Sequence, residues 1–170
     1  MSAKTIFFYL VSGTEPLYTR CLMTASHQHS FASCLERQSQ LTEEFRALPD
    51  TAARYERLMQ MGRSLRDADR SLRQTQHLVI GCQSEVYLTA RLQNGKVFFS
   101  VYSEALISAG LAALLLAIYD GEPIETILGC SPTCIPDMGI LANLTPGRSN
   151  GLASMHLRMK QEAMLLLKKV

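Results

Sequence analysis

The chain has 170 residues, of which 47% are apolar, and its 17 basic and 15 acidic side chains leave a formal net charge of +2. This length fits one domain with a sizeable core and argues against a second full domain. The charges are dispersed, with no basic run longer than Lys168-Lys169, so nothing in the composition indicates a nucleic-acid partner.

The cysteine count and the N-terminal residues predict a reducing compartment. Five cysteines make an odd number, and the first residues lack the basic start and long apolar core of a secretory signal. The apolar run from Ile6 to Val11 is far shorter than the roughly 20 residues that a membrane-spanning helix needs. We therefore expect a cytoplasmic protein without a membrane anchor.

Residues 1–38 are predicted to form an N-terminal extension of uncertain structure, ahead of one domain over residues 39–170. The run from Ile6 to Val11 favours a short strand or a packed arm, and Gly13-Thr14-Glu15-Pro16 is typical of a turn that ends it. A true start at Met23 is the alternative interpretation of this segment.

Helical periodicity follows. Thr42 is a capping residue with two carboxylates after it, which predicts a helix that starts there and that Pro49 ends. Asp50 or Thr51 is expected to cap a second helix, with Gly62 as its C-terminal stop.

The stretch from His77 to Leu88 places Cys82 on a turn before a strand. Gly81 carries no Cβ and can adopt backbone angles closed to other residues, which allows a sharp turn just before the thiol. The following residues alternate in character, as in a strand with one buried face. Two interpretations stay open from the residues alone: a buried small hydrophobe, or a reactive thiol at the mouth of a strand.

A hairpin and a core helix come next. Asn94-Gly95 lies between two alternating runs and favours the positive φ angles of a type I′ turn. Ser103 is expected to cap a helix from Ala105 to Tyr119, which is apolar on nearly every face and therefore belongs in a core. A central antiparallel hairpin with helices before and after it predicts the α+β class, a small sheet covered by α-helices.

The two cysteines of the loop from Cys130 to Cys134 have two possible functional roles. The two thiols could hold a metal with Cys82 as third ligand, or they could resolve an oxidised Cys82. Pro132 breaks helical spacing and the usual C-x2-C pair is absent. We expect structural or incidental cysteines.

The last helix is expected to begin with Thr145 as its N-cap and Pro146 in its first turn. An arginine at position 148 meets the unfavourable end of the helix dipole, so helix stability does not explain it. A surface ion pair and a partner-facing role both remain. The core-facing stripe of this helix is predicted to consist of Leu152, Met155, Met159, Ala163 and Leu166.

Four segments resemble the SufE family in the same order along the chain. Gly81-Cys82-Gln83-Ser84, followed by an apolar-aromatic strand, is similar to the family's cysteine motif. The others are Met61-Gly62-Arg63-x-Leu65, the small-apolar run from Ala105 to Tyr119 with Asp120 after it, and Leu144-Thr145-Pro146-Gly147-Arg148-Ser149-Asn150-Gly151-Leu152. Together they cover roughly residues 41–166. Tyr87 stands where the family commonly has Trp, and the N-terminal extension and the Cys130/Cys134 pair are departures from the family pattern.

The resemblance implies a sulfur acceptor and carrier. Cys82 would take persulfide sulfur from a pyridoxal-phosphate-dependent, SufS-like cysteine desulfurase, stimulate that enzyme, and pass the sulfur to a SufBCD-like scaffold complex for iron-sulfur cluster assembly. It implies no cofactor of its own and a sulfur-transfer partner rather than a stand-alone enzyme. The implied fold is the SufE/IscU-like α+β fold.

Such chemistry places demands on the surroundings of the thiol. A thiolate near neutral pH needs a cation or a hydrogen-bond donor close by, because the pKa of a free cysteine is about 8.5. A loaded persulfide also needs shelter, which predicts a loop that packs against apolar side chains when idle and swings out when docked. The supporting residues we expect are Arg148 as a cation that approaches Cys82 or meets the desulfurase, Gln83 and Ser84 as donors, and Gly81 as the hinge. Glu104 matches an acidic position that the family has near the cysteine loop, and an ordinary carboxylate at a helix start is the alternative.

Two other classes of function remain open at this stage. A zinc- or iron-binding scaffold would use Cys82, Cys130 and Cys134 with a histidine such as His77. A plain interaction protein would dock a partner through the hairpin without chemistry at Cys82. Whether the chain forms a homodimer is also left open.

Overall fold

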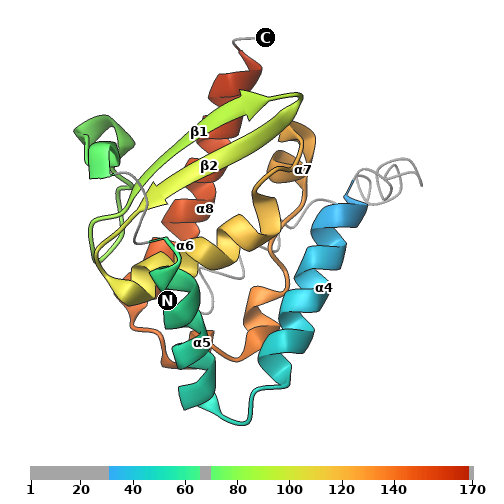
Figure 1. Cartoon of the computed structure of the whole chain (residues 1–170), viewed down its shortest axis with the longest axis vertical. Helices are drawn as coiled ribbons and strands as arrows, with labels where there is room; N and C mark the ends of the chain where they lie inside the picture. Colours follow the sequence, from blue (N-terminus) through green and yellow to red (C-terminus); the bar gives the residue numbers. More distant parts are fainter. Residues whose placement is uncertain (1–30, 66–69, 169–170) are drawn as a thin grey trace.

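The computed structural model describes residues 31–65 and 70–168, and the interpretations of residues 1–30 lie outside this part. The described residues form an α+β fold in which a β-hairpin packs against helices (Figure 1). The helices are α4 (Ala32–Arg46), α5 (Thr51–Arg63), α6 (Leu106–Tyr119), α7 (Ile124–Gly129) and α8 (Pro146–Leu167), and the strands are β1 (Tyr87–Gln93) and β2 (Lys96–Tyr102). Short 3-10 turns lie at Arg70–Leu72, Thr75–His77, Ile135–Met138 and Leu141–Asn143. The predicted fold class is confirmed.

The hairpin forms where the sequence predicts it. Strands β1 and β2 pair in antiparallel register from Tyr87 opposite Tyr102 to Gln93 opposite Lys96. Asn94 and Gly95 take φ angles of 51° and 74°, the positive values that a type I′ turn requires at both central residues.

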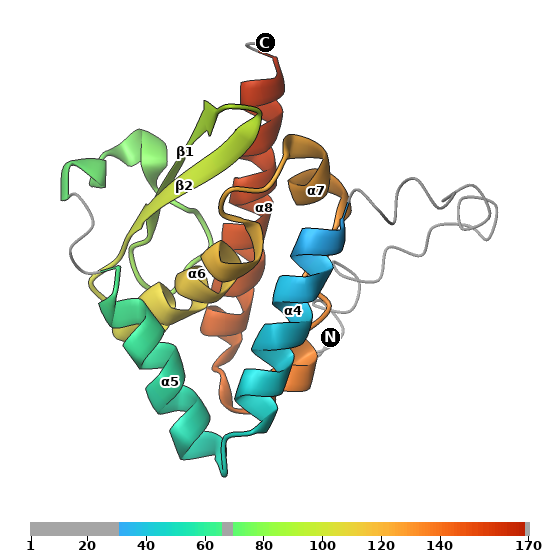
Figure 2. The same cartoon turned by 45° about the vertical axis from the view of Figure 1, so that its right-hand side comes forward.

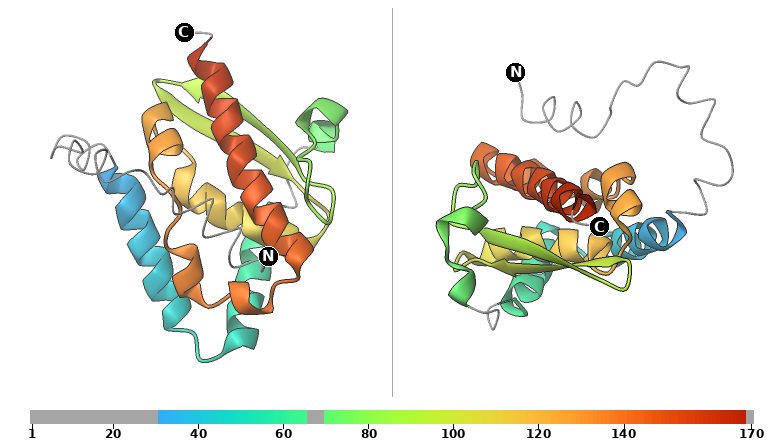
Figure 3. Two further views of the ribbon diagram at one scale, coloured as in Figure 1. Left: turned by 180° about the vertical axis from the view of Figure 1, so that it is seen from behind. Right: turned by 90° about the horizontal axis from the view of Figure 1, so that it is seen from above.

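The two faces of the hairpin differ in character. One face carries the buried pair Leu88 with Val101 and the buried Phe99 opposite the partly buried Ala90, and it packs against α8 and α6 (Figure 3). The other face carries polar pairs such as Thr89 with Ser100 and, near the turn, Arg91 stacked over Phe98. This alternation confirms the predicted strand with one buried face.

Helix α6 is the centre of the core. Ten of its residues are buried, from Ser108 to Tyr119. It crosses α5 at two glycines: a Cβ on Gly62 would lie 2.6 Å from the carbonyl oxygen of Leu106, and a Cβ on Gly110 would meet the backbone of Leu58. Gly62 therefore provides close helix packing and is not the predicted helix stop, since α5 runs on to Arg63. Within residues 31–65 and 70–168, no helix combines the length and the apolar character needed to cross a bilayer.

Helix α4 begins ten residues earlier than the periodicity predicts. Thr42 is no N-cap, because its hydroxyl donates to the carbonyl of Gln38 at 2.9 Å inside the helix. The buried stripe of α4 starts further upstream, with Cys34 and Gln38 ahead of Leu41 and Phe45. Figure 2 shows α4 and α5 diverging from the short turn that joins them, with α6 between their far ends.

The predicted caps have mixed outcomes. Asp50 is the N-cap of α5, and its carboxylate accepts from the backbone N–H of Ala53 at 2.8 Å. Ser103 does not cap α6: the cap residue is Ala105, and the buried Ser103 hydroxyl donates to the carbonyl of Glu85 at 2.8 Å. That bond ties the end of β2 to the segment between Cys82 and β1.

Candidate functional site

Cys82 lies on a short loop whose base is fixed by backbone hydrogen bonds. The N–H of Val79 donates to the carbonyl of Val86 at 2.8 Å, and Leu78 forms an isolated bridge with Tyr87. Between these ends the chain turns at Gly81, which has a φ of 94°. Ile80 stands at the tip of the turn with 78% of its surface exposed, the highest value among the exposed large apolar side chains in the described part of the chain. The prediction of a special backbone angle at Gly81 is confirmed.

The loop rests on the first two turns of α8. The Cys82 thiol donates to the carbonyl of Gly151 at 3.6 Å, and a Cβ on Gly151 would lie 3.4 Å from the sulfur. A Cβ on Gly147, one turn earlier, would lie 3.1 Å from Oε1 of Gln83. The fold thus brings the Gly81-Cys82-Gln83-Ser84 segment onto the Thr145 to Gly151 segment, although 69 residues separate Cys82 from Gly151. Small residues on this side of α8 let the loop approach the helix backbone.

Gln83 is held by the start of the same helix. Thr145 is the N-cap residue of α8, yet its side chain makes no capping bond and its hydroxyl donates instead to Oε1 of Gln83 at 2.9 Å. The Thr145 hydroxyl therefore anchors the loop to the helix. In the described part of the chain the Cys82 sulfur has one hydrogen-bond partner, Gly151, and neither Gln83 nor Ser84 donates to it.

Burial controls the protonation of Cys82. Removal from water raises the pKa of its thiol to about 11, against an ordinary value of 9.0. The carbonyl of Gly151 can accept only from the protonated thiol, so the contact with α8 agrees with that direction. In this resting arrangement Cys82 is a sheltered thiol and not a thiolate.

Arg148 does not supply the missing cation in this arrangement. Its positive charge acts on Tyr55, whose pKa is raised by burial and partly brought back by Arg148. Tyr55 lies on α5 and donates to the carbonyl of Ile140 at 3.0 Å. Among residues 31–65 and 70–168, no carboxylate forms an ion pair with the half-buried Arg148 guanidinium.

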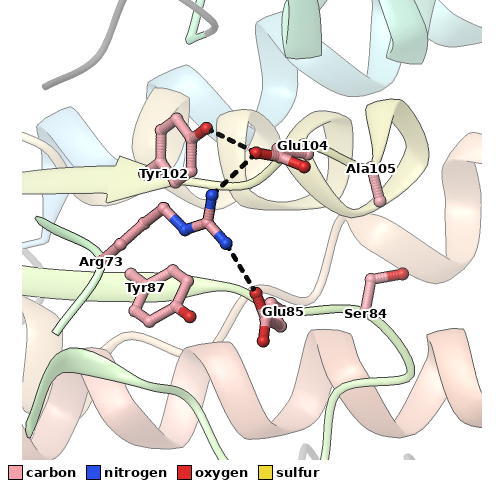
Figure 4. A pocket seen from close by; sticks show the side chains of 7 residues that line it. All are labelled: Arg73, Ser84, Glu85, Tyr87, Tyr102, Glu104 and Ala105. Carbon is pink, nitrogen blue, oxygen red and sulfur yellow. Dashed lines mark hydrogen bonds and ion pairs between the residues drawn. The ribbon is translucent and has the colours of Figure 1, made fainter. Parts of the chain in front are cut away.

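Ser84 and Glu104 line a cavity of about 210 Å³ beside the loop (Figure 4). Arg73 spans it, with Nη1 3.0 Å from Oε1 of Glu104 and Nη2 3.6 Å from Oε2 of Glu85. Glu104 also accepts from the hydroxyl of Tyr102 at 3.1 Å. Glu104 thus lines the same cavity as Ser84, and Arg73 connects it to Glu85, the residue just after Ser84.

The remaining described cysteines do not join Cys82. Cys34, Cys130 and Cys134 are buried, and the sulfur of Cys130 contacts that of Cys34 at 3.1 Å. In the parts of the chain that the structure describes, no three histidine, cysteine or acidic side chains are placed to hold a metal ion. The metal-scaffold alternative built on Cys82, Cys130, Cys134 and His77 therefore has no assembled site.

Sequence reasoning missed three residues of this site. Gly151 and Ser154 form the surface under the loop, where a Cβ on Gly81 would come within 2.6 Å of the Ser154 hydroxyl oxygen. Arg73 falls in a segment without periodicity. A signal for the first two existed, because Gly147, Gly151 and Ser154 recur at the spacing of one helix face.

The fold and the site define a small α+β protein in which, among the four described cysteines, one partly accessible thiol sits on a loop against the start of α8. A family model described as SufE, the Fe-S metabolism associated domain, matches residues 39–163. The chain belongs to the SufE family.

Relatives with known names support that placement. A SufE-like protein of Synechocystis sp. is 33% identical over 125 residues, which cover 74% of this chain and 79% of that protein. The sulfur acceptor protein CsdE of Escherichia coli is 29% identical over 126 residues, which cover 73% and 85%. The chloroplastic and mitochondrial SufE-like protein 1 of Arabidopsis thaliana is 30% identical over 128 residues, but only 34% of that longer protein is covered.

The fold also occurs in a solved structure. The solution structure of a hypothetical protein from Thermus thermophilus superposes with a TM-score of 0.65 at 24% identity, and covers 78% of this chain and 96% of that one. At this identity the likeness concerns the fold.

Proposed function

We propose that this chain accepts sulfur from a cysteine desulfurase on Cys82 and carries it as a persulfide toward iron-sulfur cluster assembly. One observation carries the proposal: of the four described cysteines, Cys82 alone is not fully buried, and it lies where two family-like motifs meet. Family membership and the sulfur-acceptor name of the Escherichia coli relative support the same role.

The transfer is a thiol exchange. The Cys82 thiolate attacks the outer sulfur of the desulfurase persulfide, a new S–S bond forms at Cys82, and the desulfurase cysteine leaves as a thiolate. No redox co-reactant is needed, since one persulfide bond replaces another. Unloading the desulfurase frees its cysteine for the next turnover, which is how this chain would stimulate it. The persulfide on Cys82 is then passed by a second exchange to an acceptor on a SufBCD-like scaffold.

The resting geometry explains why a partner is required. With its pKa raised to about 11, Cys82 is almost entirely protonated at neutral pH and is a poor nucleophile. Movement of the loop away from α8 would rehydrate the sulfur and break its bond to Gly151, and both changes lower the pKa. We propose that docking draws the loop outward about Gly81, with the exposed Ile80 seated in the partner. The thiol is therefore activated only where a donor is present.

Arg148 fits a role in docking better than one in tuning the idle thiol. Its guanidinium acts on Tyr55 in the resting state and forms no ion pair in the described part of the chain. It lies in the first turn of α8, one helical turn before the buried Leu152 and next to Gly147, where the loop approaches the helix. We propose that it meets acidic groups of the desulfurase or the incoming persulfide.

The thiol chemistry requires a reducing compartment, so we place the protein in the cytoplasm.

A direct test is to incubate the chain with a SufS-like desulfurase and free cysteine, then digest it with trypsin under non-reducing conditions. The peptide of residues 74–91 contains Cys82 and no other cysteine. We expect it to gain the mass of one sulfur atom, and the gain to disappear with dithiothreitol. The desulfurase should also turn over faster in the presence of the chain.

Two variants make the test specific. Cys82→Ser should abolish both the added sulfur and the stimulation, whereas Cys134→Ala, which removes a buried thiol, should preserve both. Stimulation that survives Cys82→Ser would instead favour a protein that acts by docking alone. Absence of sulfur on the 74–91 peptide would overturn the proposal.

A further inference from the structure

A pair of thiols far from Cys82 forms a second sulfur site. Cys34 lies on α4 and Cys130 directly follows α7, 96 residues later in the chain. Their sulfurs are 3.1 Å apart, and the two residues are 0% and 4% exposed. Both cysteines are free, and the sulfur transfer proposed above uses neither of them.

Gln38 holds this pair in place from the next turn of α4. Its side-chain nitrogen lies 3.6 Å from the sulfur of Cys34 and 3.4 Å from that of Cys130, and it also donates to the carbonyl of Ser131 at 3.1 Å. Its side-chain oxygen accepts from the backbone N–H of Cys134 at 3.2 Å. Because Gln38 is only 4% exposed, these bonds satisfy a buried amide and fix residues 130–134 against α4.

The surroundings also make the two sulfurs unequal. The pKa of Cys34 is lowered, first by its side-chain hydrogen bond with Cys130 and then by one from Gln38, against the opposing effect of burial. The pKa of Cys130 is raised, first by the same bond and then by burial. Tyr119 donates to the carbonyl of Cys130 at 2.6 Å and holds its backbone. Cys34 is therefore the thiol that loses its proton more readily and reacts first, and Cys130, whose sulfur is 3.1 Å away, is the resolving thiol.

We propose that Cys34 and Cys130 form a peroxide-reactive redox site that closes to an intramolecular disulfide. The Cys34 thiolate attacks one oxygen of hydrogen peroxide, the O–O bond breaks, and a sulfenic acid forms with release of hydroxide. The Cys130 sulfur then attacks the Cys34 sulfur, the S–S bond forms, and water leaves as the S–O bond breaks. The two sulfurs give up two electrons, and one peroxide becomes two waters. A dithiol reverses the change by exchange.

The disulfide would tie α4 to the segment after α7 without involving Cys82. A cross-link that closes a loop of nearly a hundred residues restricts the unfolded chain, so the oxidised form unfolds at a higher temperature. This site does not depend on the sulfur-carrier role, because it uses different thiols and reacts with a peroxide, whereas sulfur transfer at Cys82 needs no oxidant.

Peptide mapping tests the proposal on the full-length chain. Tryptic peptides 21–37 and 97–148 each contain two cysteines, so the test uses Cys21→Ser with Cys134→Ala, which leaves one cysteine in each. Addition of hydrogen peroxide should yield a linked 21–37/97–148 species that lacks two hydrogens and is separated by dithiothreitol. The reduced form of the same variant provides the reference melting temperature, which oxidation should raise by several degrees.

Two further variants separate the proposal from non-specific oxidation. With Cys130→Ser added, Cys34 should proceed to sulfenic and sulfinic acid without any linked peptide. Gln38→Leu keeps a similar volume but removes the donor, so the rate of linkage should fall several-fold and its pH midpoint should rise. The proposal is overturned if Cys34 and Cys130 both remain alkylatable after peroxide and denaturation, or if either is found linked to the Cys82 peptide instead.

Discussion

The backbone at Gly81 and the hydroxyl of Ser154 together define how the cysteine loop rests on α8. Alanine at position 81 would face both an unfavourable φ of 94° and a Cβ 2.6 Å from the Ser154 oxygen. We expect Gly81→Ala to lower the free energy of unfolding by about 1 to 3 kcal/mol, measured by chemical denaturation.

Two controls divide this loss into its parts. Gly95→Ala meets a positive φ of 74° with no atom within 4 Å of the new Cβ, so it reports backbone strain alone. Ser154→Ala removes the hydroxyl that the added Cβ at position 81 would strike, so combining it with Gly81→Ala should recover the steric part of the loss. No recovery in the double variant would mean that the loop does not rest on Ser154 in solution.

The sheltered state of Cys82 predicts its reactivity toward a simple alkylating agent. With a pKa of about 11 instead of 9.0, burial leaves about a hundredfold less thiolate at pH 8 than in the unfolded chain. Iodoacetamide labelling of the 74–91 peptide in the native chain should therefore be slower by about that factor, and its rate should climb until near pH 11. A rate that levels off near pH 9 would show that the loop already stands away from α8 in the free protein.

How far the site follows from sequence depends on the residue. Gly81 and Cys82 are predicted correctly as a sharp turn before a strand, because glycine and the period of two are local signals. The placement of Cys82 beside Gly151 is a contact across 69 residues, and no local signal encodes it. The roles of Gln83, Ser84, Arg148 and Glu104 in sulfur transfer stay predictions.

At the scale of elements, the α5–α6 crossing is the contact that most constrains substitution. Alanine in place of a helical glycine is normally stabilising by up to about 1 kcal/mol. At Gly110 the new Cβ would meet the carbonyl oxygen of Leu58 and lie 2.8 Å from its Cγ. We expect Gly110→Ala to destabilise the chain by about 1 to 3 kcal/mol in urea unfolding, a sign opposite to the propensity effect. A stabilised variant would show that the two helices are not in close contact.

The sequence predicts the ends of helices and strands well where a local turn or capping residue sets them, and poorly where burial in the core sets them. Asn94-Gly95 and Asp50 fix the hairpin turn and the start of α5, and both predictions are confirmed. The predicted start of α4 is wrong because Thr42 is a residue type that often caps helices but lies inside this one. The helix begins ten residues earlier, where Cys34 and Gln38 pack into the core. A polar residue such as Gln38 at a core position gives no hydrophobic period to follow.

For the whole molecule, the α+β class follows from a hairpin placed between helical segments, but the order of packing does not. Helix α8 packs against β1 and α7, and α4 packs against residues 130–138. The hydrophobic periodicity of the sequence does not predict these contacts. Buried polar groups created by this packing are invisible in the sequence. His156 on α8 is one of them: it stacks on Tyr119 at 5.4 Å between ring centres, and its Nε2 has no hydrogen-bond partner in the described part of the chain.

This histidine makes stability sensitive to mild acid. Burial, with a smaller contribution from the charge of Lys160, lowers the pKa of His156 from 6.5 to about 4. Because the unfolded chain binds the proton more readily, stability is fully present above pH 6.5 and is lost as pH falls toward 4. The full pKa shift corresponds to a loss of about 3 kcal/mol in the free energy of unfolding. Because the imidazole is not completely buried, we expect the measured loss to be somewhat smaller. Urea unfolding between pH 7 and 4 should show this loss, and His156→Phe, which keeps an aromatic ring against Tyr119 and cannot titrate, should flatten the profile. An unchanged profile in that variant would assign the acid sensitivity to other groups.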